Sequence, residues 1–419
     1  SYLLDQSIGF KAVSEASSVT VKDGKKFVLV GGTDGETELV GTTGGAVTVK
    51  GADSVFQLGT TGVADAKGHL QTVTVADNGA FSSKAGTYRI NTLNLTGGTG
   101  AVEAGSVLTI GTVSDAAGAT MTNAGTLTYT NAATFNADYA NSKTMTLEAG
   151  ATVNGGFSNA QGAELKSNGT LIFANGTAVT NEGTIRQTGA STTIARDFLN
   201  DENAKFGAAE SDVAVSGKTF SNAGDFAAKA LSIESQGGIA TAEGSITYAG
   251  NMEISGTSRA TVSGTVYANE LDVQGTLIRG RTASIVTGQG AIDRILASNA
   301  DHRTRLEALG VVAGESLGRS ARSNGIMLAA AAAPTYTLDS TATDEDVLGF
   351  DGEYGNTLVD VTWTDEQSTA VSASSGAAAD GNYSVGLVGD TTFADKSSLT
   401  TLGTFYVDHA LTMGEGTTF

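Results

Sequence analysis

Residues 243–277 read EGSITYAGNMEISGTSRATVSGTVYANELDVQGTL and contain one short motif three times. Each copy is a glycine followed by Ser or Thr and then by an aliphatic residue, as in Gly244-Ser245-Ile246 and Gly264-Thr265-Val266. Between the copies apolar and polar residues alternate, for example in Met252-Glu253-Ile254-Ser255, and a period of two is typical of a strand with one buried face. The stretch therefore predicts short β-strands separated by glycine turns.

The motif recurs across residues 121–281. Gly224 and Gly244 are 20 residues apart, whereas Gly155 and Gly169 are 14 apart, and solenoid coils tolerate irregular spacing through loop insertions. A strand of four or five residues is not stable alone, but coils that stack edge to edge bury one apolar face continuously. We therefore expect an all-β solenoid with about 20 residues per coil. The copies of the motif lie at Asn123–Leu127, Asn168–Leu171, Asn181–Ile185, Glu243–Ile246, Ser263–Val266 and Gln274–Leu277.

The first 120 residues follow a looser version of the same theme. Val19-Thr20-Val21 leads to Asp23-Gly24, and Val73-Thr74-Val75 leads to Asn78-Gly79. Such dipeptides supply the positive φ that tight turns require. Residues 1–120 are therefore predicted to form N-terminal β-rich coils, ahead of the solenoid repeats of 121–281.

The pattern changes at about residue 282. Apolar and polar positions then step by three and four, which predicts one helix, and an Ala-rich connector follows it up to Pro334. We expect the helix in 282–333 to cap an end of the solenoid; a processing or hinge role for the Arg-containing connector is the alternative. The helical positions are Ile292, Ile295, Leu296, Asn299, Arg303, Leu306 and Leu309.

Strand patterns return after the connector. Leu358–Trp363 alternates, and Gly and Asp turns separate it from later strands, so 334–419 is predicted to be a smaller C-terminal β unit. Because Glu415–Phe419 falls inside a strand pattern, we expect the chain to be an excised portion of a longer protein.

Composition excludes several classes of function. The net charge is −20 and the pI is about 4.4, so neither nucleic acid nor an anionic membrane is an expected partner. The chain has no cysteine, which excludes disulfides, thiolate zinc sites and thiol nucleophiles. No window approaches the roughly 20 apolar residues of a membrane-spanning helix. We expect a soluble chain.

Catalytic and cofactor sites are not predicted. Gly314-Glu315-Ser316-Leu317-Gly318 matches the nucleophile elbow of α/β-hydrolases, but the strand–turn–helix setting is missing, and Gly and Ser are common enough here for a chance match. The three histidines, His69, His302 and His409, lie in three different segments, so a clustered zinc site is not expected.

The carboxylates lead to the same conclusion. Asp201-Glu202 and Glu210 with Asp212 are expected in solvated loops, without the basic partners that a polysaccharide lyase uses. Ca²⁺ prefers several oxygen ligands, and carboxylates that could supply them gather at Asp344-Glu345-Asp346, Asp351 and Glu353. Their spacing matches no known calcium-binding loop. No catalytic, cofactor-binding or metal-binding residue is therefore assigned.

The segment Leu147–Gly156, LEAGATVNGG, together with the Gly-Thr-Leu coils, resembles the passenger regions of bacterial autotransporter adhesins. The resemblance covers roughly residues 16–281. It implies a right-handed parallel β-helix, secretion through an outer membrane and display on the cell surface. No protease triad signature of catalytic passengers accompanies it.

These observations predict a non-catalytic bacterial cell-surface adhesin or structural module that mediates attachment or self-association. Its partners are expected to be host glycans, host proteins or sister copies of the chain. One alternative is a self-assembling surface-layer protein, which predicts calcium-dependent sheets. Another is a carbohydrate-active β-helix enzyme or a phage tailspike, which predicts a groove with facing acids or an obligate trimer.

Overall fold

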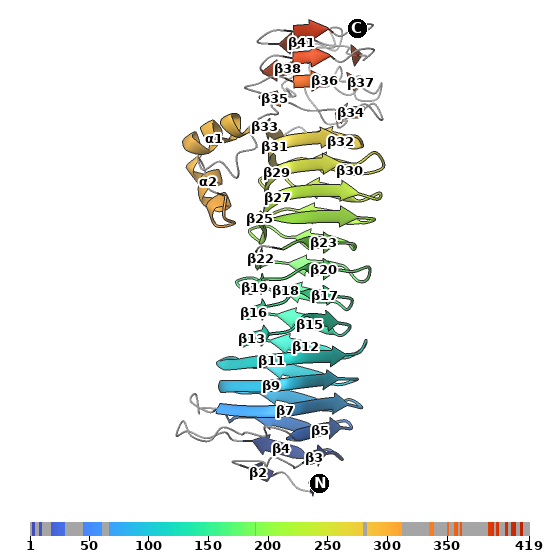
Figure 1. Ribbon diagram of the computed structural model, residues 1–419, viewed down its shortest axis with the longest axis vertical. Coiled ribbons are helices and arrows are strands. Elements are labelled where there is room, and N and C mark those ends of the chain that lie inside the picture. Colours follow the sequence, from blue (N-terminus) through green and yellow to red (C-terminus); the bar gives the residue numbers. More distant parts are fainter. Residues whose placement is uncertain are drawn as a thin grey trace, which may run out of the picture. The chain divides into compact units, whose positions relative to one another are not determined.

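The computed structural model describes residues 18–29, 45–60, 67–188, 190–279 and 283–311 continuously, with short strands before residue 11 and after residue 334. The described residues form a right-handed parallel β-solenoid with two short helices, which confirms the predicted fold class (Figure 1). The chain divides into two compact units, Ser1–Ser191 and Thr192–Phe419. The segment boundaries predicted from the sequence stay predictions.

In unit 1, Ser1–Ser191, each coil contributes strands to two parallel sets, here named A strands and B strands. The A strands are β1 (Tyr2–Leu4), β3 (Ser18–Val21), β5 (Ala46–Lys50), β7 (Lys67–Ala76), β9 (Gly86–Leu95), β11 (Ser106–Asp115), β13 (Thr126–Tyr129), β14 (Ala133–Phe135), β16 (Thr144–Leu147), β17 (Ala151–Val153), β19 (Glu164–Ser167), β20 (Leu171–Phe173) and β22 (Thr184–Gln187). The B strands are β2 (Ile8–Phe10), β4 (Lys26–Leu29), β6 (Val55–Leu58), β8 (Ala80–Ser83), β10 (Thr99–Val102), β12 (Thr120–Asn123), β15 (Asp138–Asn141), β18 (Phe157–Asn159) and β21 (Val179–Asn181).

Strand register gives the coil length directly. Lys67 pairs with Thr87 and Thr87 pairs with Val107, which is an advance of 20 residues per coil. Thr126 pairs with Thr144, an advance of 18. The predicted coil of about 20 residues is therefore confirmed, and differences in loop length account for the variation.

The 14-residue spacing of glycines has another origin. Gly155 lies against Ala137 in the preceding coil, whereas Gly169 lies against Ala149 and Gly150. The two glycines occupy different corners, so their spacing measures a path around one coil. The interpretation of this spacing as a variable coil length was wrong.

Aromatic side chains stack in the interior of unit 1. Phe27, Phe56 and Phe81 occupy one register position on β4, β6 and β8, with successive ring centroids 5.5 and 5.8 Å apart. All three are buried. Full burial of a phenylalanine stabilises a fold by about 2–3 kcal/mol, so this column favours the observed register over a shifted one.

An asparagine ladder occupies one interior corner of unit 1. Asn123, Asn141, Asn159 and Asn181 end successive B strands, and none is more than 1% exposed. The Nδ2 of each of the first three donates to the Oδ1 of the next asparagine, at 2.7, 2.7 and 2.8 Å. Each also donates to a carbonyl oxygen farther along the chain. The ladder satisfies buried amides that would otherwise cost free energy.

In two copies of the repeated motif, the glycine lies two residues after a ladder asparagine. A side chain at Gly125 would collide with the carbonyl oxygens of Glu103 and Ser106, and one at Gly183 would collide with those of Ala160 and Ala163. Neither glycine has positive φ. At these two copies glycine is needed because the backbones of stacked coils approach closely. Gly244, in another copy, has a φ of 76° and no atom within 4 Å of an added Cβ, so there the left-handed turn favours glycine.

Unit 2, Thr192–Phe419, repeats the two-set arrangement. Its A strands are β23 (Thr192–Ile194), β25 (Lys205–Ser216), β27 (Asp225–Glu234), β29 (Ile246–Ile254), β31 (Thr265–Val273) and β33 (Ser284–Thr287). Its B strands are β24 (Phe198–Asn200), β26 (Thr219–Asn222), β28 (Gly238–Thr241), β30 (Arg259–Val262), β32 (Thr276–Arg279) and β34 (Thr335–Leu338).

The predicted single helix is two helices, α1 (Gln289–Ser298) and α2 (Ala300–Glu307). Asn299 separates them because its backbone is extended, with φ −107° and ψ 91°. Its Oδ1 accepts from the backbone N–H of His302 at 3.1 Å, so the asparagine caps the second helix. The spacing of apolar residues predicted the helical segment, but the break at Asn299 was missed.

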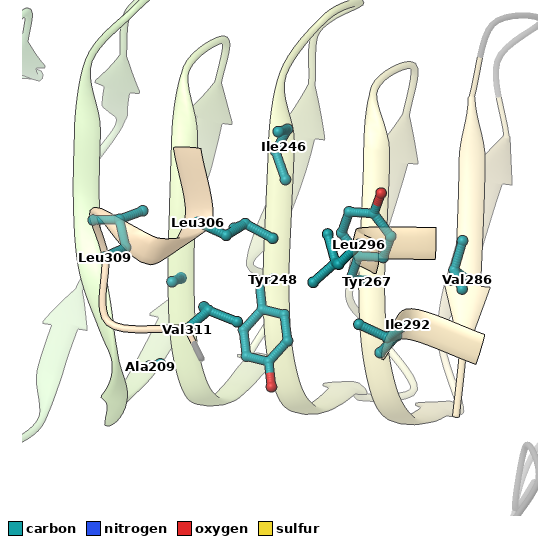
Figure 2. Packing of buried hydrophobic residues seen from close by; sticks show 11 residues of the cluster. Ala209, Ile246, Tyr248, Tyr267, Val286, Ile292, Leu296, Leu306, Leu309 and Val311 are labelled. Carbon is teal, nitrogen blue, oxygen red and sulfur yellow. The ribbon is translucent and has the colours of Figure 1, made fainter. Parts of the chain in front are cut away.

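The helices cover the side of the A strands and not an end of the solenoid, which corrects the predicted cap (Figure 1). Tyr248, Tyr267 and Val286 are in register on β29, β31 and β33 and face the helices, as Figure 2 shows. Because these outward side chains are apolar, the strands need a second buried face. Ile292, Leu296, Leu306, Leu309 and Val311 complete the cluster from the helical side.

The strands from β35 onward also pair in parallel, whereas β34 pairs with β32 and belongs to the B strands. The C-terminal unit expected at 334–419 stays a prediction. Three narrow sheets arise from β35, β38 and β41, from β36, β39 and β42, and from β37 and β40. The strands are β35 (Phe350–Asp351), β36 (Asn356–Leu358), β37 (Val361–Thr362), β38 (Ser384–Val388), β39 (Thr391–Phe393), β40 (Leu399–Thr400), β41 (Thr404–Val407) and β42 (Leu411–Met413).

Candidate functional site

A groove follows the outer face of the B strands in unit 2. Thr219, Gly238 and Arg259 are paired neighbours on β26, β28 and β30. Gly238 has no side chain, so the middle strand leaves a trough between its neighbours. Ala240, two residues further along β28 on the same face, extends the trough with only a methyl group.

The groove is polar and encloses about 480 Å³. β28 forms its floor, and residues from β26, β30 and three turns form its walls. It contains two cationic side chains, one carboxylate, three threonine hydroxyls and one glutamine amide, and it contains no aromatic ring. The lining residues are Asp197, Gly217, Lys218, Thr219, Gln236, Gly237, Gly238, Ile239, Ala240, Thr257, Arg259 and Thr261.

Hydrogen bonds hold the charged walls in place. Arg259 Nε donates to Thr261 Oγ1 at 3.4 Å, which directs the guanidinium along its own strand. Asp197 Oδ1 accepts from the backbone N–H of Thr219 at 3.2 Å. Lys218 is exposed in the turn that enters β26. The groove therefore presents charges of both signs from neighbouring coils of one sheet.

The turns beside the groove are closely bonded. Gly217 has φ of 69° and Gln236 has φ of 65°, and the backbone N–H of Gly217 donates to Ser235 at 3.1 Å. The N–H of Gly238 donates to the carbonyl oxygen of Lys218 at 2.9 Å. Backbone bonds between coils thus fix the corner that carries Lys218.

The structure keeps apart the histidines that it describes. His69, on β7, hydrogen-bonds through Nε2 to Asn91 Oδ1 at 3.0 Å. His302, on α2, shares a hydrogen bond of 2.7 Å with the hydroxyl of Tyr267, and burial together with the nearby Arg305 lowers the pKa of this imidazole. His409 lies outside the described residues.

The acidic candidates are also separate. Asp201 and Glu202 lie in an exposed turn, as predicted. Glu210 and Asp212 lie within β25 and not in a loop, because the strand continues through an irregularity in its pairing with β27. Within the part of the chain that the structure describes, no three His, Asp or Glu residues are arranged to hold a metal ion.

The remaining candidates lie mostly outside the described residues. Ser316, Asp344-Glu345-Asp346 and Glu353 are among them. Asp351 ends β35. The nucleophile-elbow and calcium hypotheses for these segments therefore stay untested.

One buried carboxylate was not singled out from the sequence. Asp115, at the end of β11, accepts from the backbone N–H of Asn136 at 2.6 Å and from the hydroxyl of Tyr139 at 2.8 Å. Burial raises the pKa of Asp115, and these hydrogen bonds oppose the rise. The side chain belongs to the interior of unit 1, so we assign it to stability.

Among the described residues, neither helix is long and apolar enough to cross a membrane. The groove was missed in the sequence because its signal, Gly238 and Ala240 at outward positions of one strand, becomes visible only when the strand register is known. Comparisons of the chain with protein-family models, with curated proteins and with solved structures give no match.

Proposed function

We propose that this chain is a non-catalytic, extracellular adhesive module of a bacterial cell surface and that the groove of unit 2 is its attachment site. The supporting observation is the groove itself: a concave, hydroxyl-rich and charged surface on a scaffold with a buried, hydrogen-bonded interior. Such a surface suits hydroxyl-bearing ligands, above all glycans, because every wall offers donors or acceptors.

The groove favours binding over hydrolysis. Glycoside hydrolases that work with acids use two carboxyl groups that flank the scissile bond. The groove lining contains one carboxylate, Asp197, together with two cations. Binding without bond cleavage is therefore the function that this lining supports best.

The test is to fill the groove without disturbing the core. Ala240→Phe places an aromatic ring on the groove floor, and Ala140→Phe makes the same change at an exposed outward position of β15 in unit 1. We expect the first variant to lose binding to an array of immobilised glycans and the second to bind like the unmodified chain. Equal binding by both variants would rule out the groove, and concentration-dependent sheets would favour the surface-layer alternative.

A further inference from the structure

We propose that the groove recognises a sugar that carries a carboxylate, held within a glycan chain. The proposal rests on the proposed attachment function and names the ligand class of the same site. Its basis is the charge of the lining, where Lys218 and Arg259 outnumber the one acid, Asp197. The chain as a whole has a net charge of −20, so a groove with more cations than acids differs in sign from the average charge of the chain.

The two cations stand on opposite walls. Lys218 precedes β26 and Arg259 begins β30, and β28 lies between these strands. Two strand spacings separate the walls, so the trough is roughly 10 Å across. A glycan lying along β28 would pass between both cations, and one carboxylate would be within reach of either.

Arginine and lysine can share this task. The guanidinium of Arg259 is planar and offers five N–H donors, and its Nε is directed to Thr261. A carboxylate can accept two parallel hydrogen bonds from such a group, whereas the Lys218 ammonium acts as a compact charge. The threonine hydroxyls of both walls then suit the sugar hydroxyls beside the acid.

The lining also indicates which ligands are disfavoured. Sites for neutral sugars gain affinity when aromatic rings cover the apolar face of the sugar, and the groove lining has no aromatic residue. Dense polyanions are disfavoured for a different reason, since the net charge of −20 repels them as a whole. An isolated acidic sugar satisfies both conditions.

Calorimetric titration with sialyllactose and with its methyl ester tests the proposal, because the ester removes the one charge and keeps the sugar. We expect the acid to bind at least about tenfold more tightly, as charge-assisted hydrogen bonds predict. The methyl glycoside of galacturonic acid compared with its methyl ester makes the same test on a second source of carboxylate. Equal affinity for the charged and neutral member of both pairs would overturn the proposal.

Matched variants assign the effect to residues. Arg259→Gln and Lys218→Gln are each expected to lower affinity for whichever acid binds by about tenfold and to lower affinity for the neutral partner by less. Lys229→Gln is the control. Lys229 is exposed on β27 and lies outside the groove lining, so this substitution removes the same charge without changing the groove. Asp197→Asn should raise the affinity, because it removes the only carboxylate of the lining. An equal loss in the Lys229 control would mean that net charge, not the groove, controls binding.

The outcomes separate this proposal from the proposed function. If Ala240→Phe abolishes glycan binding while charged and neutral sugars bind equally, the groove is an attachment site and the preference for acids is wrong. If Ala240→Phe has no effect on glycan binding, the groove is not the attachment site. That conclusion would hold whether or not the chain prefers acidic sugars.

Discussion

The asparagine ladder is a residue-level device that ties one coil to the next. Asn141 donates to Asn159 at 2.7 Å and to the carbonyl oxygen of Glu164 at 3.1 Å, and it accepts from Asn123 at 2.7 Å. Asn141→Ala would leave these buried groups without partners. We expect the free energy of unfolding to fall by about 3 kcal/mol, measured by urea denaturation with circular dichroism.

Asn154→Ala is the matched control for the ladder. Asn154 also donates to another asparagine, Asn136, at 2.8 Å, but this pair is exposed and water can replace the lost partner. The control should therefore lose less than about 0.5 kcal/mol. Similar losses at both positions would show that burial does not govern the strength of the ladder.

The buried carboxyl of Asp115 makes stability depend on pH. Burial raises the pKa of Asp115 above its ordinary value, so the unfolded chain releases this proton at a lower pH than the folded chain does. As the pH rises from the ordinary value of 3.8 to the folded one, this group therefore destabilises the fold. Asp115→Asn removes the charge and keeps an acceptor for Asn136.

We therefore expect Asp115→Asn to gain stability relative to the unmodified chain as the pH rises through the acidic range, and to keep that gain at neutral pH. Urea denaturation of both proteins between about pH 4 and pH 7 measures the difference. A constant difference across this range would show that Asp115 titrates normally in the folded chain.

At the scale of elements, one ion pair joins the second helix to the A strands beside the apolar cluster. Asp225 follows the motif glycine where other coils have Ser or Thr, and its side chain is only 3% exposed. Arg305 on α2 lies 2.6 Å from Asp225 Oδ1 and also donates to the carbonyl oxygen of Gly244 at 2.9 Å. Lys205 is farther from the same carboxylate, at 3.9 Å. Arg305 is therefore the main partner of a buried charge.

Arg305→Gln is expected to lower the free energy of unfolding by about 2 kcal/mol and to speed amide hydrogen exchange in α2. The figure is below that of a fully enclosed pair because Arg305 is 29% exposed. Arg303→Gln is the control, since its contact with Glu307 lies at the surface and should contribute less than about 0.5 kcal/mol. Restoration of stability by Asp225→Thr in the Arg305→Gln background would confirm that the unpaired carboxylate is the cause.

The elements also show what sequence patterns can and cannot predict. Alternation placed Val73 and Val75 inside β7 and Met252 and Ile254 inside β29, because a period of two fixes which face is buried. The same rule fails at Tyr248, which is buried on the outer face by helices more than 40 residues later in the chain. Contacts of that range leave no local trace in the sequence.

At the scale of the whole molecule, the solenoid was predictable because the coils repeat one local solution, an alternating strand followed by a turn that often contains glycine. The groove was not, because it arises from three side-chain positions on three coils, Thr219, Gly238 and Arg259, and only their register makes Gly238 a gap. The proposed ligand class rests on the charge of the groove lining, and the net charge also leads to a prediction about association between copies.

The last prediction concerns association. Each copy carries a net charge of −20, so copies repel one another at low ionic strength. Among the described residues of one copy, no group of three or more His, Asp or Glu side chains is arranged to hold a metal ion. We therefore expect sedimentation to give a monomer with or without millimolar calcium. Magnesium at equal ionic strength separates charge screening from specific binding. Assembly with calcium but not with magnesium would contradict the proposed adhesive function and favour a surface-layer protein. Assembly with both ions would mean that screening of the charge repulsion is enough for copies to associate.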